Sequence, residues 1–238
     1  VAAAAVIPSL GTGLPFRSAA DAIALVGLLA IARVFMSLAA MDIGTAFGTL
    51  GARRDMMIGF LAEPALLMVI FVASLLSATT ALPLIAERLV VAPLALYPSL
   101  AFTAVAFTMV LLAENARIPV DNPATHLELT MIHEAMLLEY SARHLALMEW
   151  AAALKLFNYA CIGFALFVPW GASIGETGIG ALALSIPALL AKLGVAGLWL
   201  ALLEPVSAKL RVFRAPEFMA TAFMFAVLGL LVHLLLGA

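Results

Sequence analysis

Acidic side chains beside long apolar runs are the feature of this sequence that is best suited to chemistry. The segment Glu114-Asn-Ala-Arg-Ile-Pro-Val-Asp121 directly follows an uncharged run, Val90–Ala113. The acids that come after Asp121 are Glu128, Glu134, Glu139 and Glu149. An ionisable group at membrane depth costs about 2.5–3.5 kcal/mol on insertion scales, and such groups usually mark an ion path. The pattern therefore predicts carboxylates that take part in ion transfer.

Complete catalytic motifs do not accompany these acids. The run His133-Glu134-Ala-Met-Leu137 begins like a zinc-protease motif, but leucine stands where the second histidine belongs. His126 and His133 are seven residues apart, which is weak support for a metal site. Cys161 is the single cysteine, whereas an iron–sulfur cluster typically needs four cysteine ligands. We expect no catalytic, metal or cofactor site within this chain alone.

Composition places the chain in a lipid bilayer. Hydrophobic residues make up 66% and charged residues 11% of the sequence, against about 45–50% and about 25% in soluble domains. The mean hydropathy is +1.17. The alternation of polar and apolar residues that a membrane β-barrel needs is absent, so we expect an all-α integral membrane protein. The net charge of −2 provides no field that would attract nucleic acid.

Six windows are apolar enough to cross the hydrocarbon core, which requires about 20 residues per helix. They are Ala22–Met41, Met57–Thr79, Ala92–Ala113, Leu147–Val168, Ala181–Leu203 and Phe218–Leu236. We predict a single membrane domain over residues 1–238, built as a bundle of six or more tilted helices. Val1–Leu10 is apolar but too short to span, and it has the character of the tail of an earlier helix. We therefore expect an N-terminal helix and loop to precede this sequence.

Basic residues in the connections predict the orientation. Alternate connections carry Arg53, Arg54, Arg117, Arg143, Lys209, Arg211 and Arg214. The other connections carry only Arg17 and Arg88. Because cytoplasmic loops are enriched in lysine and arginine, we place the three basic connections in the cytoplasm.

The connection between the third and fourth windows is too long for a simple turn. Pro119 and Pro123 interrupt its start, and Thr125 with Glu128 matches a capping box. Apolar residues then recur at helical spacing at Leu127, Met131, Ala135, Leu138 and Ala142. This pattern predicts an amphipathic helix that lies on the membrane surface or dips beneath a partner subunit. Glu139 and Arg143 are four residues apart and are expected to pair along it.

Several charges interrupt the apolar windows. Arg33 and Lys192 lie near mid-span, where we expect a buried ion pair or a water-lined path. Glu63 precedes Pro64, and a proline kink there would open space for water beside the carboxylate. Glu149 and Lys155 lie in the fourth window. A proton relay and a static network of salt bridges both remain open on this pattern.

Longer motifs resemble a known family. Glu114-Asn-Ala-Arg-Ile-Pro-Val-Asp-Asn-Pro123 is similar to the Glu-x-Asn-Arg-x-Pro-x-Asp-x-Pro signature of the membrane subunit that anchors the peripheral arm in respiratory complex I. Glu139-Tyr-Ser141 and Glu149-Trp150 resemble further motifs of that subunit. The segments 124–141 and 205–217 resemble the related subunit of membrane-bound, energy-converting nickel–iron hydrogenases of the formate hydrogenlyase and hydrogenase-4 type.

The resemblance implies a multi-pass subunit of a bacterial or archaeal cytoplasmic membrane. Its implied partners are peripheral hydrogenase and iron–sulfur subunits on the cytoplasmic side, and antiporter-like subunits in the bilayer. The nickel–iron centre and the iron–sulfur clusters are expected in those partners. Quinone is possible, since the complex I subunit forms much of the quinone cavity. His126 and Leu127 replace part of the acidic run of complex I, which favours the hydrogenase branch.

The resemblance also assigns residues and leaves alternatives. An ion-coupling role is implied for Glu63, Glu114, Asp121, Glu128, Glu139 and Glu149. The basic residues expected to support them are Arg33, Arg117, Arg143, Lys155 and Lys192. The alternatives are a quinone-cavity subunit of complex I and a purely structural docking anchor. An independent secondary transporter would show internal sequence symmetry, and the sequence shows none.

Overall fold

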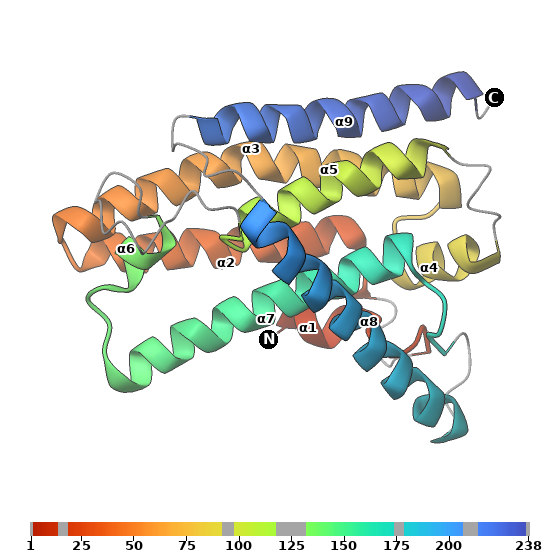
Figure 1. Cartoon of the computed structure of the whole chain (residues 1–238), viewed down its shortest axis with the longest axis horizontal. Coiled ribbons are helices and arrows are strands. Elements are labelled where there is room, and N and C mark those ends of the chain that lie inside the picture. Colours follow the sequence, from red (N-terminus) through yellow and green to blue (C-terminus); the bar gives the residue numbers. More distant parts are fainter. Residues whose placement is uncertain are drawn as a thin grey trace.

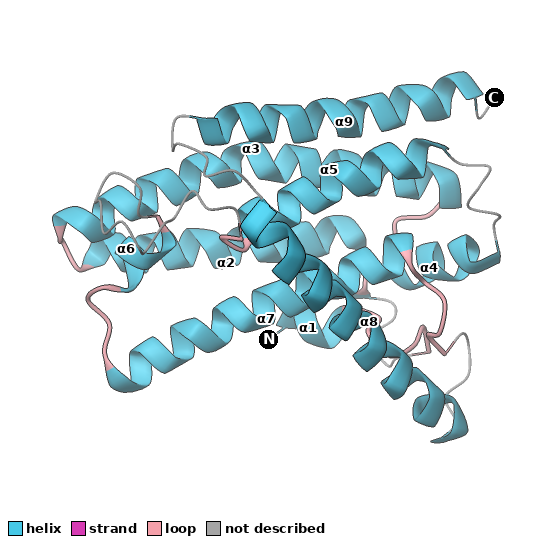
Figure 2. Ribbon diagram, in the orientation of Figure 1, coloured by secondary structure: helices cyan, strands magenta, loops and turns pink. Residues whose placement is uncertain are grey.

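Helices form nearly all of the structure (Figure 2). The computed structural model describes residues 2–13, 19–91, 98–117, 132–173, 179–206 and 214–236. The helices in these ranges are α1 (Ala2–Val6), α2 (Ala22–Asp42), α3 (Ala46–Ser77), α4 (Leu82–Val91), α5 (Pro98–Glu114), α6 (His133–Leu137), α7 (Ala142–Phe167), α8 (Ile179–Val206) and α9 (Ala215–Leu236).

Five of these helices are long and apolar enough to cross a membrane: α2, α3, α7, α8 and α9. Helix α5 is apolar but shorter, and the first six residues of its expected window, 92–97, lie outside the described residues. The prediction of an all-α, multi-pass membrane protein is confirmed. The ends of α2 and the starts of α3, α7 and α9 gather on the side of the bundle where α6 lies, at the left of Figure 1.

Helix α3 runs much further than the sequence predicts. We expected Arg53 and Arg54 to lie in a loop, but both are inside α3, so this prediction is wrong. Thr45 caps the helix, since its side chain accepts a hydrogen bond from the N–H of Gly48 at 3.3 Å. Residues on one face of this first part are buried against α2 and α6, so tertiary packing stabilises the additional turns.

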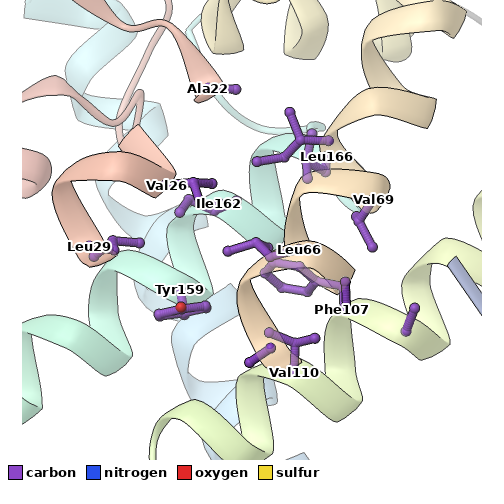
Figure 3. Packing of buried hydrophobic residues seen from close by; sticks show 14 of the residues in the cluster. Ala22, Val26, Leu29, Leu66, Val69, Phe107, Val110, Tyr159, Ile162 and Leu166 are labelled. Atoms are coloured by element: carbon purple, nitrogen blue, oxygen red, sulfur yellow. The ribbon is translucent and has the colours of Figure 1, made fainter. Parts of the chain in front are cut away.

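The core is formed by α3 together with α2, α5, α7 and α9 (Figure 3). Phe107 of α5 contacts Tyr159 and Phe167 of α7, with ring centroids 6.4 and 5.6 Å apart. Gly229 of α9 lies so close to α5 that an added Cβ would be 2.7 Å from a methyl carbon of Thr103. A small residue at this crossing lets two membrane helices approach closely.

The side chain of Asp21 caps the start of helix α2. The Oδ1 atom of Asp21 accepts hydrogen bonds from the N–H groups of Ile23 and Ala24 at 2.9 and 3.1 Å. Its Oδ2 atom accepts one from the Thr80 hydroxyl at 2.6 Å. The Thr80 bond is the largest cause that lowers the pKa of Asp21, with the two backbone bonds adding to it and partial burial opposing it.

Replacing Asp21 by alanine should destabilise the protein by about 1 kcal/mol, the usual effect of losing an N-cap. Asparagine retains the acceptor and should cost less. Because folding lowers the Asp21 pKa, its charge contributes stability that is present above its unfolded pKa of about 3.9 and is lost as the pH falls through the lower, folded value. Thermal unfolding in detergent, followed from about pH 2 to about pH 6 on either side of that pKa, measures this loss of stability. Equal acid destabilisation of the wild type and Asp21→Asn would contradict it.

Helix α8 lies apart from the bundle and crosses α7 (Figure 1). None of its most apolar window is buried within the chain. Lys192 donates a hydrogen bond to the carbonyl oxygen of Val168 at 2.7 Å, directly after the end of α7. Its ammonium also lies 5.8 Å from the ring centre of Phe164. The expected buried ion pair at Lys192 is therefore wrong in the described part of the chain, because the carboxyl end of α7 binds the cation instead. The expected water-lined path stays a prediction.

Replacing Lys192 by methionine should loosen the crossing of α7 and α8. The expected loss is about 0.3–1 kcal/mol, the range for a cation at a helix carboxyl end. Amide hydrogen exchange of residues 164–170 should rise in Lys192→Met and return toward the wild-type rate in Lys192→Arg. Unchanged exchange in Lys192→Met would show that the ammonium does not stabilise this helix end.

Candidate functional site

A group of charged side chains meets inside the bundle around Arg33 of α2. Its Nη1 atom lies 3.0 Å from Oε1 of Glu63, and its Nε atom lies 3.9 Å from Oδ2 of Asp55. Its Nη2 atom donates to Oε2 of Glu114. Glu63 and Asp55 come from α3 and Glu114 from the end of α5, so one guanidinium joins three helices.

A second cation completes the surroundings of Glu114. Lys155 of α7 lies 2.9 Å from Oε2 of Glu114 and donates a hydrogen bond to its backbone carbonyl at 2.7 Å. Glu114 is only 3% exposed and lies between Arg33 and Lys155. Tyr159, one turn after Lys155 on α7, is also buried and interacts with Glu114. The central carboxylate is thus held by two cations.

His133 of α6 connects this group to the surface. Its Nε2 atom lies 3.2 Å from Oδ1 of Asp55. The Asp55 residue is 5% exposed, whereas the His133 side chain is 27% exposed. We use the name charge cluster for Arg33, Asp55, Glu63, Glu114, His133 and Lys155. Continuous contacts lead through it from a partly exposed imidazole to a buried carboxylate.

The sequence of α3 makes room for this arrangement. Asp55, Gly59 and Glu63 follow at intervals of four residues, which places them on one face of the helix. A Cβ atom at Gly59 would collide with the guanidinium of Arg33. Glycine therefore provides the slot in which Arg33 lies between the two acids.

Burial makes the energy of the charge cluster sensitive to a change of charge on any of its members. Arg33, Asp55 and Glu114 are each less than 9% exposed, so their charges interact with one another more strongly than with water. Removing one partner of such a group leaves an uncompensated buried charge. Pairing accounts for the stability of the arrangement, and a change of charge on any member alters the energy of the others.

Four of the predicted residues meet in the charge cluster: Arg33, Glu63, Glu114 and Lys155. Asp55 and Tyr159 were not predicted as site residues, and His133 was considered only for a failed zinc motif and for a metal site with His126. The spacing of Asp55, Gly59 and Glu63 at intervals of four residues was a signal that could have indicated Asp55. Asp121 and Glu128 lie outside the described residues.

The remaining predicted residues lie elsewhere. Glu139, Arg143 and Glu149 are exposed near the start of α7. Arg117 forms an ion pair with Glu204 at 3.2 Å, in which both side chains are nearly half exposed. Exposed pairs of this kind contribute about 0–1 kcal/mol, so Arg117 does not support the buried acids in the described structure.

The expected amphipathic helix is interrupted. Its first part, up to residue 131, lies outside the described residues. Helix α6 then ends at Leu137, Ser141 is extended, and Ala142 has a positive φ of 47°. A continuous helix with a Glu139–Arg143 pair is therefore wrong, because this turn separates the two residues and redirects the chain into α7 (Figure 1).

Comparison with known proteins places this chain in a family. Residues 1–235 match the protein family described as NADH dehydrogenase. The chain is also 31% identical over 226 residues to formate hydrogenlyase subunit 4 of Escherichia coli (strain K12), which covers 95% of this chain and 72% of that protein. The chain belongs to the NADH dehydrogenase family of membrane subunits.

A second member of the family supports the same branch. Hydrogenase-4 component C of Escherichia coli (strain K12) is 34% identical over 168 residues, which covers 69% of this chain and 51% of that protein. The chain thus spans about half of one relative and nearly three quarters of the other. The expected resemblance to the hydrogenase branch of this family is confirmed, and the chain is a membrane subunit of the kind found in multi-subunit redox complexes.

Residues that could hold a metal do not gather in the described part of the chain. No group of three or more histidine, cysteine, aspartate or glutamate side chains has the arrangement of a metal site there. In the charge cluster, Arg33 and Lys155 both contact the same oxygen atom, Oε2 of Glu114.

Proposed function

We propose that this chain is the membrane-anchoring and coupling subunit of a nickel–iron hydrogenase complex in a bacterial or archaeal cytoplasmic membrane. In this proposal, electron transfer in a peripheral arm drives proton movement through the charge cluster toward antiporter-like membrane subunits. The observation that carries it is the burial of Glu114 between Arg33 and Lys155, with His133 and Asp55 leading to the surface.

We propose a proton as the transferred ion, and the charge of the cluster fits the uptake of one positive charge. With His133 neutral, the charge cluster contains three carboxylates and two cations. One added proton therefore neutralises the group. Arg33 and Lys155 both contact Oε2 of Glu114, and the buried Oε1 atom, which has no hydrogen-bond partner in the described chain, is the proposed proton acceptor. A hard cation such as sodium would instead need several oxygen ligands.

Water is proposed to extend the path. Ser37, Asn115 and Asn158 each bury a side-chain oxygen that has no hydrogen-bond partner within the described chain. They lie next to members of the charge cluster in the sequence, one turn after Arg33, directly after Glu114 and directly before Tyr159. Because buried polar atoms are normally hydrogen-bonded, we propose that ordered water at these positions links the cluster to the rest of the bundle.

The exposed charges near the start of α7 are proposed to bind the peripheral arm. Glu139, Arg143 and Glu149 are exposed on the side of the bundle where α6 lies, which the basic residues predict to be cytoplasmic. A purely structural anchor is the second candidate, and these exposed residues favour it. In that case the buried acids would affect only assembly.

Purification of the tagged chain from native membranes tests the proposed membership. We expect copurification of a nickel–iron subunit, iron–sulfur subunits and antiporter-like membrane subunits. Recovery with an NADH-oxidising module would instead support the quinone-reducing alternative. Native gels of Glu139→Gln and Glu149→Gln variants separate anchoring from coupling, because loss of the arm from the membrane in these variants indicates docking through the exposed acids.

A further inference from the structure

An apolar groove runs along the outer face of α3, away from the charge cluster. Its volume is about 780 Å³. The exposed large side chains that line it are Leu67, Phe71 and Leu75 of α3, Ile23 of α2 and Phe223 of α9. Each of these five residues is between 36% and 53% exposed. The groove therefore presents apolar side chains outward from the bundle.

The groove has the length of one membrane leaflet. It extends from Pro64 to Thr80 along the half of α3 that leads away from α6 (Figure 1). At about 1.5 Å per helical residue, the part from Pro64 to Ala78 measures roughly 20 Å. Half of a bilayer's hydrocarbon core is about 15 Å thick. An extended acyl chain that enters from the end near Thr80 would thus reach the middle of the membrane.

Opposite charges flank the end of the groove near Thr80. Asp21 accepts a hydrogen bond from the Thr80 hydroxyl, and its carboxylate is ionised at neutral pH because the ordinary pKa of aspartate is about 3.9. Arg88 of α4 is exposed and donates to the carbonyl oxygen of Ser77, next to the groove-lining Ala78. The carboxylate is therefore one hydrogen bond from the groove-lining Thr80, and the guanidinium binds the residue before the groove-lining Ala78.

We propose that this groove binds a glycerophospholipid whose headgroup carries a primary ammonium. One acyl chain lies along α3, the ammonium lies at Asp21, and the phosphate lies at Arg88. The middle of the lining, from Leu67 to Phe71, is bulky, whereas membrane helix interfaces are enriched in small residues, so this part supports lipid over a partner helix. A zwitterionic headgroup matches the two charges, since each forms a charge-assisted hydrogen bond.

Native mass spectrometry of the purified complex tests the proposed site. Phosphatidylethanolamine is compared with phosphatidylcholine, which has the same charge but no ammonium N–H, and with phosphatidylglycerol. We expect phosphatidylethanolamine to bind about fivefold to tenfold more tightly than either, the effect of one charge-assisted hydrogen bond. Asp21→Asn retains the helix cap but should abolish this preference. Asp42→Asn changes an exposed acid at the other end of α2 and should leave it unchanged.

A photo-crosslinking residue in place of Leu67 identifies the occupant directly. Attachment of lipid to this position supports the proposal, and competition by added phosphatidylethanolamine in the wild-type background but not in Asp21→Asn supports the headgroup assignment. Equal binding of all three lipids, an unchanged preference in Asp21→Asn, or attachment of a polypeptide at position 67 would each overturn it.

Discussion

Replacing Glu114 by glutamine should stop ion translocation while the complex stays assembled. Glutamine retains the volume and one acceptor oxygen, but it cannot hold the negative charge that Arg33 and Lys155 surround. Groups that donate and accept protons typically contribute factors of about 10²–10⁴ to proton transfer. We therefore expect the number of protons moved per electron to fall at least about tenfold. Inverted membrane vesicles with a pH-sensitive dye and a hydrogenase assay measure both quantities together.

Two controls are needed to interpret the result for Glu114→Gln. Glu204→Gln alters an exposed acid at the end of α8 and should retain coupling. A native gel shows whether the peripheral arm stays bound in each variant. Wild-type coupling in an assembled Glu114→Gln complex would contradict a role of the charge cluster. Loss of the arm in that variant would support the purely structural anchor, and a sodium flux without proton flux in the wild type would identify sodium as the ion.

Replacing Arg33 by methionine should cause a large loss of stability. It leaves Asp55, Glu63 and Glu114 without their shared cation. Removing one partner from a buried ion pair costs about 3–5 kcal/mol. Unfolding of the purified protein in mixed detergent micelles, followed by circular dichroism, measures the change. A loss below about 1 kcal/mol would mean that the guanidinium is replaceable by water.

Two further variants show whether Arg33 acts through these acids. Arg117→Ala removes an exposed ion pair with Glu204, so it should cost no more than about 1 kcal/mol. Combining Arg33→Met with Glu114→Gln removes both a cation and the acid it pairs with. Because residues in one ion-pair network are not additive, the double variant should be less destabilised than the sum of the two single variants. Strict additivity would mean that Arg33 stabilises the protein through contacts other than the one with Glu114.

Much of the fold follows from hydrophobicity and charge alone. The apolar windows predicted α2, α7, α8 and α9 to within a few residues, because a lipid solvent requires long, hydrogen-bonded helices. The mid-span position of Arg33 also predicted its buried ion pairs correctly. The start of α3 could not be predicted from apolarity, since it carries Arg53, Arg54 and Asp55 and is stabilised by packing of its buried face against α2 and α6.

The composition of the charge cluster depends on contacts between distant segments. Asp55 looked like part of a basic loop, and its role follows from the 3.2 Å contact with His133, which is far away in the sequence. Lys192 looked equivalent to Arg33, yet it binds the carbonyl oxygen of Val168 because α8 crosses the end of α7. Spacing along one helix predicted the face shared by Asp55, Gly59 and Glu63, but it could not predict which helix would lie against that face.

Infrared difference spectroscopy of the assembled complex is the most direct measurement of whether the charge cluster changes protonation during turnover. Reduction by hydrogen should produce a carboxyl C=O band that is absent from the oxidised state, and this band should disappear in Glu114→Gln but persist in Glu204→Gln. A reduced-minus-oxidised spectrum without any carboxyl band, or one that is identical in the wild type and Glu114→Gln, would contradict proton coupling through Glu114.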